Sequence, residues 1–267
     1  MDRDSIISTK GCLILVAIVL AIPLFILGGV GVKTWLPLRE AKETLTELDR
    51  SLGDGAAYIP TPSGAIPAER MELFVELRAV MVAACADYGE VQEGFDSVAE
   101  LETKDQGDPA EVRDVAVDLG GAALAITPFL ARFFVLRNEA LLEASMGLEE
   151  YCYIFAIAYR DHLLSASTRG EIFSDGEALS PDASLRLQAC LAQQREQAPP
   201  SLTADLDVEM RAMAADPTRL IWQEGSPDGV EASVRPFRNR LDTLFCAATA
   251  GLEMERDPGR ALWVAIE

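Results

Sequence analysis

The residue types that carry out most protein chemistry are scarce and scattered in this sequence. His162 is the only histidine, so any Ser-His-Asp or Cys-His scheme would have to use that one ring. It follows Arg160 and Asp161 near an expected helix end, where the helix dipole favours a cation. We therefore expect His162 to cap that helix or to face solvent. A di-iron bundle site is excluded, because it needs a Glu-x-x-His motif on each of two helices and none occurs.

The acidic and basic residues also form no recognisable catalytic motif. No Walker A, dinucleotide-binding, HExxH or GxSxG motif occurs. Glu149 and Glu150 are adjacent, so they face different sides of a helix, and we interpret them as acids in its first turn. Arg235, Arg238 and Arg240 form a basic cluster, interpreted as a solvated face, with an anion or partner site as the alternative. We predict no catalytic, cofactor-binding or metal-binding residues, and no cofactor.

The five cysteines leave two interpretations open. Cys12 lies in the apolar N-terminal run, whereas Cys85, Cys152, Cys190 and Cys246 are far apart, and no Cys-x-x-Cys occurs. We expect the last four to be small buried side chains, as free cysteines often are. The alternative is one or two disulfides if the domain is exported, and four cysteines allow three full pairings. Zinc sites rarely have such spacings.

The chain is strongly acidic, with a formal net charge of −20. Residues 1–33 hold three basic and two acidic residues, so the remainder carries −21. Such a domain repels nucleic acid phosphates and anionic lipid headgroups, since binding either relies on Lys and Arg. We expect no nucleic-acid partner. The hydrophobic share of 49% is high enough for a buried core and too high for a disordered chain.

The strongest pattern is an uncharged apolar run of 22 residues from Gly11 to Val32. As a helix it would span about 33 Å, which matches a hydrocarbon core of about 30 Å. A buried helix of a soluble protein rarely lacks every polar side chain over that length, and a cleavable signal peptide has a shorter apolar region. We therefore predict one uncleaved transmembrane helix, in which Pro23 is tolerated as a kink.

The flanks of this run give conflicting signals about its orientation. Two basic residues precede it and four follow it: Arg3 and Lys10, then Lys33, Arg39, Lys42 and Arg50. Counted alone, they favour a cytoplasmic C-terminal side. Short N-terminal tails with a basic residue beside the apolar run usually stay inside, however, and the acidic domain is no barrier to export. We expect a single-pass protein of the inner (cytoplasmic) membrane whose C-terminal domain is periplasmic or extracellular.

The rest of the chain has helical periodicity and proline-rich breaks. A polar helix is expected from Leu38 to Leu52, followed by a linker with three prolines. A helix over residues 67–102 carries a heptad seam that includes Phe74, Leu77 and Met81. A helix over 109–144 has a stretch from Gly120 to Leu136 that is apolar nearly all round, so it is expected to be the central helix, with a kink at Pro128.

Further helices are expected after this central one. Ser145 is expected to cap a helix that runs to about Leu164, and residues 165–180 to form a loop. Pro181 opens a helix to about Gln197, a short helix follows Thr203, and a last one covers residues 230–252. No alternating β-branched runs occur, so little or no sheet is expected.

These elements predict an all-α protein: one transmembrane helix followed by a bundle of about five to six helices. The predicted parts are a tail (1–10), a transmembrane helix (11–32), a juxtamembrane helix (33–53), a Pro/Gly linker (54–66) and an acidic helical domain (67–267). The heptad seam is interpreted as core of the bundle, with a dimer seam as the alternative. The tyrosines at 88, 151, 153 and 159 are expected in the core or at its edge.

Three short stretches resemble an uncharacterised family of membrane-anchored, helical bacterial envelope proteins. They are Tyr58-Ile-Pro before Ile66-Pro-Ala-Glu-Arg-Met-Glu-Leu-Phe74, then Met146-Gly-Leu-Glu-Glu-Tyr151, and Val234-Arg-Pro-Phe-Arg-Asn-Arg-Leu241. The family has no assigned reaction or catalytic residues. The resemblance therefore implies the architecture, a membrane anchor with a helical domain, and no activity.

Three functional hypotheses follow. The first is a non-enzymatic envelope protein whose anchored bundle binds another protein or scaffolds a membrane complex. The second is a periplasmic small-ligand binding or sensor module, since helical bundles hold ligands between their helices. The third is an enzyme that uses carboxylates alone, for example on glycans, which requires two of them about 5–9 Å apart in a cleft.

Overall fold

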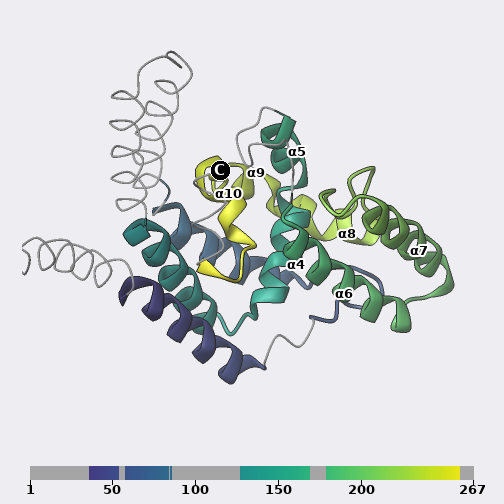
Figure 1. Ribbon diagram of the computed structural model, residues 1–267. Helices are drawn as coiled ribbons and strands as arrows, with labels where there is room; N and C mark the ends of the chain where they lie inside the picture. The colour runs from purple at the N-terminus through teal and green to yellow at the C-terminus, as the bar shows by residue number, and fades with distance from the viewer. Residues whose placement is uncertain (1–35, 54–57, 84, 86–126, 169–178, 259–267) are drawn as a thin grey trace, which may run out of the picture.

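Helices make up the architecture throughout the part of the chain that the computed structural model describes, namely residues 36–53, 58–83, 85, 127–168 and 179–258 (Figure 1). No strand occurs in these ranges, so the prediction of a helical bundle is confirmed. None of the helices in these ranges is long and apolar enough to cross a membrane. The expected transmembrane helix (11–32), Cys12, Tyr88 and the stretch around Gly120 lie outside the described residues.

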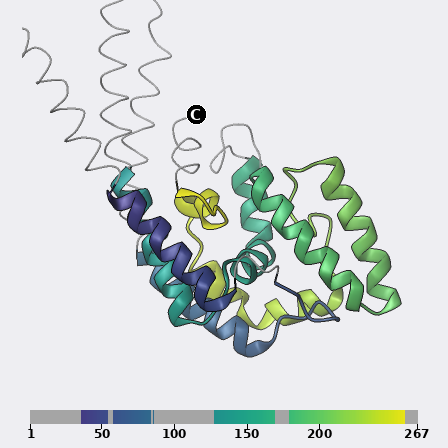
Figure 2. The same cartoon turned by 60° about the horizontal axis from the view of Figure 1, so that its bottom comes forward.

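Three helices form one side of the molecule. They cover residues 36–52, 68–83 and 127–143. The first and third lie side by side in both views (Figures 1 and 2). Their contact is polar as well as apolar, because buried Asn138 donates from Nδ2 to the carbonyl of Ala41 at 3.3 Å and to Oγ1 of Thr44 at 3.2 Å. The predicted juxtamembrane helix is thus part of the bundle and not a free stalk.

The heptad seam of the second helix faces the core. Phe74, Leu77 and Met81 are all at most 4% exposed, as the interpretation of this seam as bundle core predicts. Helix 127–143, by contrast, buries one face only: Leu130, Phe134 and Leu141 are buried, whereas Arg132 is exposed. Within residues 127–143, the described part of the expected helix 109–144, this is therefore not the central helix that we expected.

The central position belongs to α4 (Leu148–Ala158), in which every residue except Glu150 is buried. This helix has other elements on all sides (Figure 1). Its aromatic side chains contact one another at tilted angles, for example Phe155 and Tyr159 with 5.0 Å between ring centroids. Tyr151, Tyr153 and Tyr159 are each 0% exposed, which confirms their expected place in the core. After the cap residue Tyr159 the chain continues as α5 (Arg160–Thr168), so residues 165–168, which we expected in a loop, are helical.

The expected cap at Ser145 is wrong, because this residue ends the preceding helix. Its φ of 46° is in the left-handed region. The amide of Met146 donates to the carbonyl of Leu141 and that of Ser145 to Leu142, which is the Schellman pattern at a helix C-terminus. The next helix starts after its N-cap residue Gly147, which has no side chain that could make a capping hydrogen bond.

An antiparallel pair of helices, α6 (Pro181–Gln197) and α7 (Pro200–Ala215), packs on the other side of α4 (Figure 1). The predicted bounds of α6 are confirmed: Ser180 accepts a hydrogen bond from the amide of Ala183, and Pro181 occupies the first turn. Helix α7 starts three residues before the predicted Thr203, because Pro200 occupies its first turn in the same way.

The predicted single helix over residues 230–252 is wrong. The chain forms instead α8 (Asp228–Val234), the 3-10 turn η1 (Arg235–Phe237), α9 (Arg238–Asp242) and, after a break, α10 (Ala247–Glu253). Pro236 lacks the amide hydrogen that a continuous helix requires. The break is also held by bonds to residues far away in the sequence, which a local sequence pattern cannot predict.

Candidate functional site

The break before α10 is joined by a disulfide to Cys85 and by a hydrogen bond to Arg78 of helix 68–83. Cys85 and Cys246 are joined, with their Cα atoms 6.0 Å apart. Arg78 donates from Nη2 to the carbonyl of Leu244 at 3.1 Å and from Nη1 to Glu253 Oε1 at 2.5 Å. Burial opposes the charge of Arg78, yet the carboxylate of Glu253 raises its pKa overall. The same carboxylate accepts a hydrogen bond of 2.6 Å from the hydroxyl of Tyr151.

A second buried arginine, Arg137, closes the C-terminal end of α10. Its Nη1 donates to the carbonyls of Leu252, Glu253 and Glu255 at 3.2, 2.9 and 2.8 Å. Carbonyls at a helix end have no intrahelical partner and carry partial negative charge, so a guanidinium there satisfies both needs. Its burial lowers the pKa of Arg137. The stacking of its guanidinium on Phe134, 4.7 Å from the ring centroid, adds a further favourable contact.

Two more arginines join the segment after α10 to the start of α4. Arg186 of α6 donates to the carbonyl of Met254 and lies near Glu149, with 3.6 Å between Nε and Oε2. Arg256 donates to Asp49 of helix 36–52 and, at 3.2 Å, to Oε1 of Glu149. The segment after α10, helix 36–52 and the central helix α4 therefore meet at the guanidinium of Arg256.

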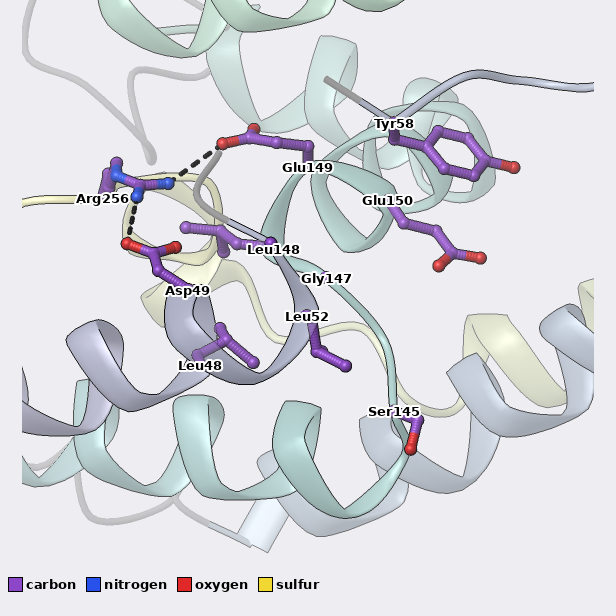
Figure 3. A pocket seen from close by; sticks show the side chains of 11 residues that line it. Leu48, Asp49, Leu52, Tyr58, Ser145, Gly147, Leu148, Glu149, Glu150 and Arg256 are labelled. Carbon is purple, nitrogen blue, oxygen red and sulfur yellow. Dashed lines mark hydrogen bonds and ion pairs between the residues drawn. The ribbon is translucent and has the colours of Figure 1, made fainter. Parts of the chain in front are cut away.

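A pocket of about 230 Å³ opens beside this meeting point (Figure 3). Its walls come from the end of helix 36–52, from Tyr58, from the turn before α4 and from the first turn of α4: Leu48, Asp49, Leu52, Gly53, Tyr58, Ser145, Gly147, Leu148, Glu149, Glu150 and Arg256. Asp49 and Arg256 lie on one side and Tyr58 and Glu150 on the other. Leucines from both helices supply the apolar part of the lining.

The two glutamates that begin α4 have separate partners, as their adjacency predicted. Glu150 accepts two bonds from Arg70, each 2.6 Å long. Glu149 is 7% exposed, and burial raises its pKa above the ordinary value of 4.5 although Arg186 and Arg256 lower it. The carboxylate-only enzyme needs an open space between two carboxylates, whereas the guanidinium of Arg256 lies between Asp49 and Glu149 (Figure 3).

A second hollow, a groove of about 320 Å³, lies between helix 68–83 and helix 127–143. Its floor and walls are apolar and its rim carries two acids: Leu73, Leu77, Val80, Ala140 and Ala144, with Glu76 and Glu143. Val80 is 47% exposed, which is high for a branched aliphatic side chain inside a helix. None of the residues that we had singled out for chemistry lines this groove.

The residues singled out from the sequence fall mostly on the surface. His162 is half-exposed, bonds Asp242 at 2.9 Å and stacks on Phe245. Within the basic cluster, Arg238 pairs with Glu231 at 2.8 Å and Arg240 with Glu72 at 2.7 Å. These contacts agree with the interpretation of this cluster as a solvated face.

The two other cysteines in the described part of the chain are not bonded to each other. Cys152 and Cys190 are buried thiols, and burial raises the pKa of each to about 12. Among Cys85, Cys152, Cys190 and Cys246, the structure thus combines both interpretations that the sequence left open: one disulfide and two buried free thiols. In the part of the chain that is described, no group of three or more His, Cys, Asp or Glu side chains is placed to hold a metal ion.

The three stretches on which the family resemblance depends lie together in space. Arg70 of the first pairs with Glu150 of the second, and Glu72 of the first with Arg240 of the third. Comparison of the whole chain with family models, with curated proteins and with solved structures gave no match.

Proposed function

We propose that this chain is a membrane-anchored helical module that docks a partner protein at the cell envelope. The observation that carries the proposal is the groove between helix 68–83 and helix 127–143. It exposes apolar surface between two rows of helical side chains, a form that accepts the apolar face of a third helix. Its acidic rim, Glu76 and Glu143, and the net charge of −20 complement basic residues. The expected occupant is a partner helix whose apolar stripe is flanked by Lys or Arg.

The anchor is the apolar run of residues 11–32, and the packing of helix 36–52 supports its role. That helix follows the run after a few residues and is held to the bundle through Asn138 and Arg256. The domain would therefore sit directly at the bilayer surface. The acidic domain does not adhere to anionic headgroups by charge, so the apolar run is needed to keep it there. We also propose that the chain is related to the uncharacterised family of envelope proteins that it resembles.

The disulfide supports an exported domain. Disulfides persist in oxidising compartments and are rare where glutathione and thioredoxin keep thiols reduced. The bond between Cys85 and Cys246 therefore favours the orientation in which the N-terminus stays in the cytoplasm, which the flanking basic residues left open. Alkaline phosphatase fused after Glu267 should be active in cells, and a fluorescent protein that folds only in the cytoplasm should be dark at the same position. The opposite pair of results would reverse the topology.

Docking in the groove is tested by photocrosslinking in intact cells. A photoreactive phenylalanine analogue replaces Val80, and Val208 of α7, which is 58% exposed, serves as the matched control site. We expect one dominant adduct at position 80 and none at 208. Mass spectrometry should map it to a helix with flanking Lys or Arg, and Glu76→Lys with Glu143→Lys should remove it. An adduct with a second copy of the chain, equal adducts at both sites, or indifference to charge reversal would contradict the proposal.

A further inference from the structure

The groove between helix 68–83 and helix 127–143 has a length that limits what its occupant presents. Leu73 and Val80 line one wall. They are two turns apart, which corresponds to about 10.5 Å along the helix axis. The facing wall carries Ala140 and Ala144, one turn apart. The groove therefore covers about two turns of an occupying helix.

The two walls of the groove differ in the size of their side chains. Leucines and a valine form one wall, whereas Ala140 and Ala144 on the other wall carry a single methyl group each. The space beside these alanines is left for side chains of the occupant. A cavity of about 150 Å³ holds one benzene molecule, so a groove of about 320 Å³ has room for about two bulky apolar side chains.

Both of these side chains must come from the same face of the occupant. Residues three or four apart on a helix lie on one face, whereas residues two apart point to different sides. Anchors at such spacings are the usual way in which an amphipathic helix binds a groove. Two turns of the occupant hold two anchors with this spacing.

The acids on the rim are available to the occupant. No hydrogen bond or ion pair engages Glu76 or Glu143 among the described residues. Glu72, on the same helix as Glu76, pairs instead with Arg240 at 2.7 Å. A basic residue on either flank of the occupant therefore gains a carboxylate partner without displacing another.

We propose that the partner helix carries two bulky apolar anchors, three or four residues apart, with Lys or Arg on both flanks, and that Ala140 and Ala144 select for these anchors. The anchors pack beside the two alanines, and the basic side chains reach Glu76 and Glu143. This inference rests on the proposed docking function and defines the motif that its partner must contain.

The test uses the full chain in nanodiscs of zwitterionic lipid and two synthetic peptides of identical composition. Each peptide is an Ala/Lys helix of about 18 residues, which exceeds the length of about 12–15 residues below which isolated helices are marginal. Each contains two phenylalanines, four residues apart in the first peptide and two residues apart in the second. Fluorescence anisotropy should show at least tenfold tighter binding of the first peptide.

The comparison of these peptides isolates the spacing of the anchors. Their charges are equal, so general attraction to the acidic domain cancels, and empty nanodiscs measure the binding to lipid. Equal affinities of the chain for both peptides would overturn the proposal.

Three variants test the role of the alanines. Ala140→Leu and Ala144→Leu each fill the groove, and each should weaken binding of the first peptide at least tenfold. The matched control is Ala212→Leu in α7, also a half-buried alanine in a helix, which should change the affinity less than twofold. Urea midpoints show which variants are folded. Wild-type affinity in both groove variants would overturn selection by the alanines.

The crosslink at position 80 separates this inference from the docking function. The partner segment in the adduct should contain two anchors with the stated spacing. An adduct whose segment lacks them would overturn the motif and leave docking in the groove intact. Selective binding of the first peptide without any adduct in cells would support the motif and overturn the docking function.

Discussion

Arg78 and Glu253 form an ion pair in which neither side chain is exposed to solvent, although 175 residues separate them in the chain. Helix 68–83 supplies the arginine and α10 the glutamate. The glutamate is further bonded by Tyr151 of the central helix and by Thr249 of its own helix. This one carboxylate thus links three elements of the bundle.

Removal of one member of that pair should be strongly destabilising. Glu253→Ala leaves the guanidinium of Arg78 buried without its counter-charge, for which about 3–5 kcal/mol is typical. The free energy of unfolding is measured by urea titration of the purified chain, followed by the fluorescence of tryptophan, since Trp222 is buried.

The half-exposed pair of Arg240 with Glu72 is the control for this change. Glu72→Ala should cost less than about 1 kcal/mol, because solvent screens such a pair. Equal losses in the Glu253→Ala and Glu72→Ala variants would show that Glu253 is not held as described.

The pH dependence of stability should carry the signature of Glu149. Burial places its pKa in the folded protein above its ordinary value of 4.5. Between these two values the folded state holds the proton that the unfolded state has lost, so stability falls as pH rises through this window. Glu149→Gln does not titrate and lacks this slope.

The variant should therefore gain stability relative to the wild type as pH rises from the ordinary pKa of 4.5 towards neutral pH. Urea titrations of both proteins across this range measure the difference, from which the titration of all other carboxylates cancels. A difference that is constant with pH would mean that the pKa of Glu149 is not raised. A change in the opposite direction would mean that the ion pairs with Arg186 and Arg256 outweigh burial.

Local rules predicted the elements whose ends are made by neighbouring residues. The bounds of α6 follow from Ser180, which caps it, and from Pro181 in its first turn. The helix over residues 36–52 and the buried heptad positions of Phe74 and Met81 were predicted for the same reason, since period and caps are local properties.

Elements that depend on distant contacts were not predictable in this way. The break at residues 243–246 is held by Cys85 and Arg78, which act over more than 160 residues. Arg137 and Arg186 belong to no sequence motif, yet they bond carbonyls after α10. The pocket and the groove are formed by residues of separate helices, so no sequence motif predicts either of them.

The disulfide should make stability sensitive to reductant. It closes a loop with a sequence separation of 161 residues, and loss of a native disulfide typically costs about 2–5 kcal/mol. Dithiothreitol should lower the urea midpoint of the wild type and leave that of Cys246→Ser unchanged. Alkylation of the unfolded chain before reduction should modify Cys152 and Cys190 and spare Cys85 and Cys246, and after reduction it should modify all four. Modification of Cys85 and Cys246 without prior reduction, in protein purified without reductant, would contradict the bond.

A last prediction concerns Gly64, which lies where the linker packs against α6 and α8. Its φ of +76° is in the left-handed region, and an added Cβ would lie 2.9 Å from Cγ2 of Val230 and 3.1 Å from Nε2 of Gln194. Gly64→Ala therefore adds a clash, typically about 1–3 kcal/mol, to the backbone strain of about 1–2 kcal/mol. Gly225, with φ +143° and no atom within 4 Å of such a Cβ, carries backbone strain alone. Gly64→Ala should thus lower the free energy of unfolding by more than Gly225→Ala does, and the reverse order in urea titration would mean that the linker does not pack against α6 and α8 as described.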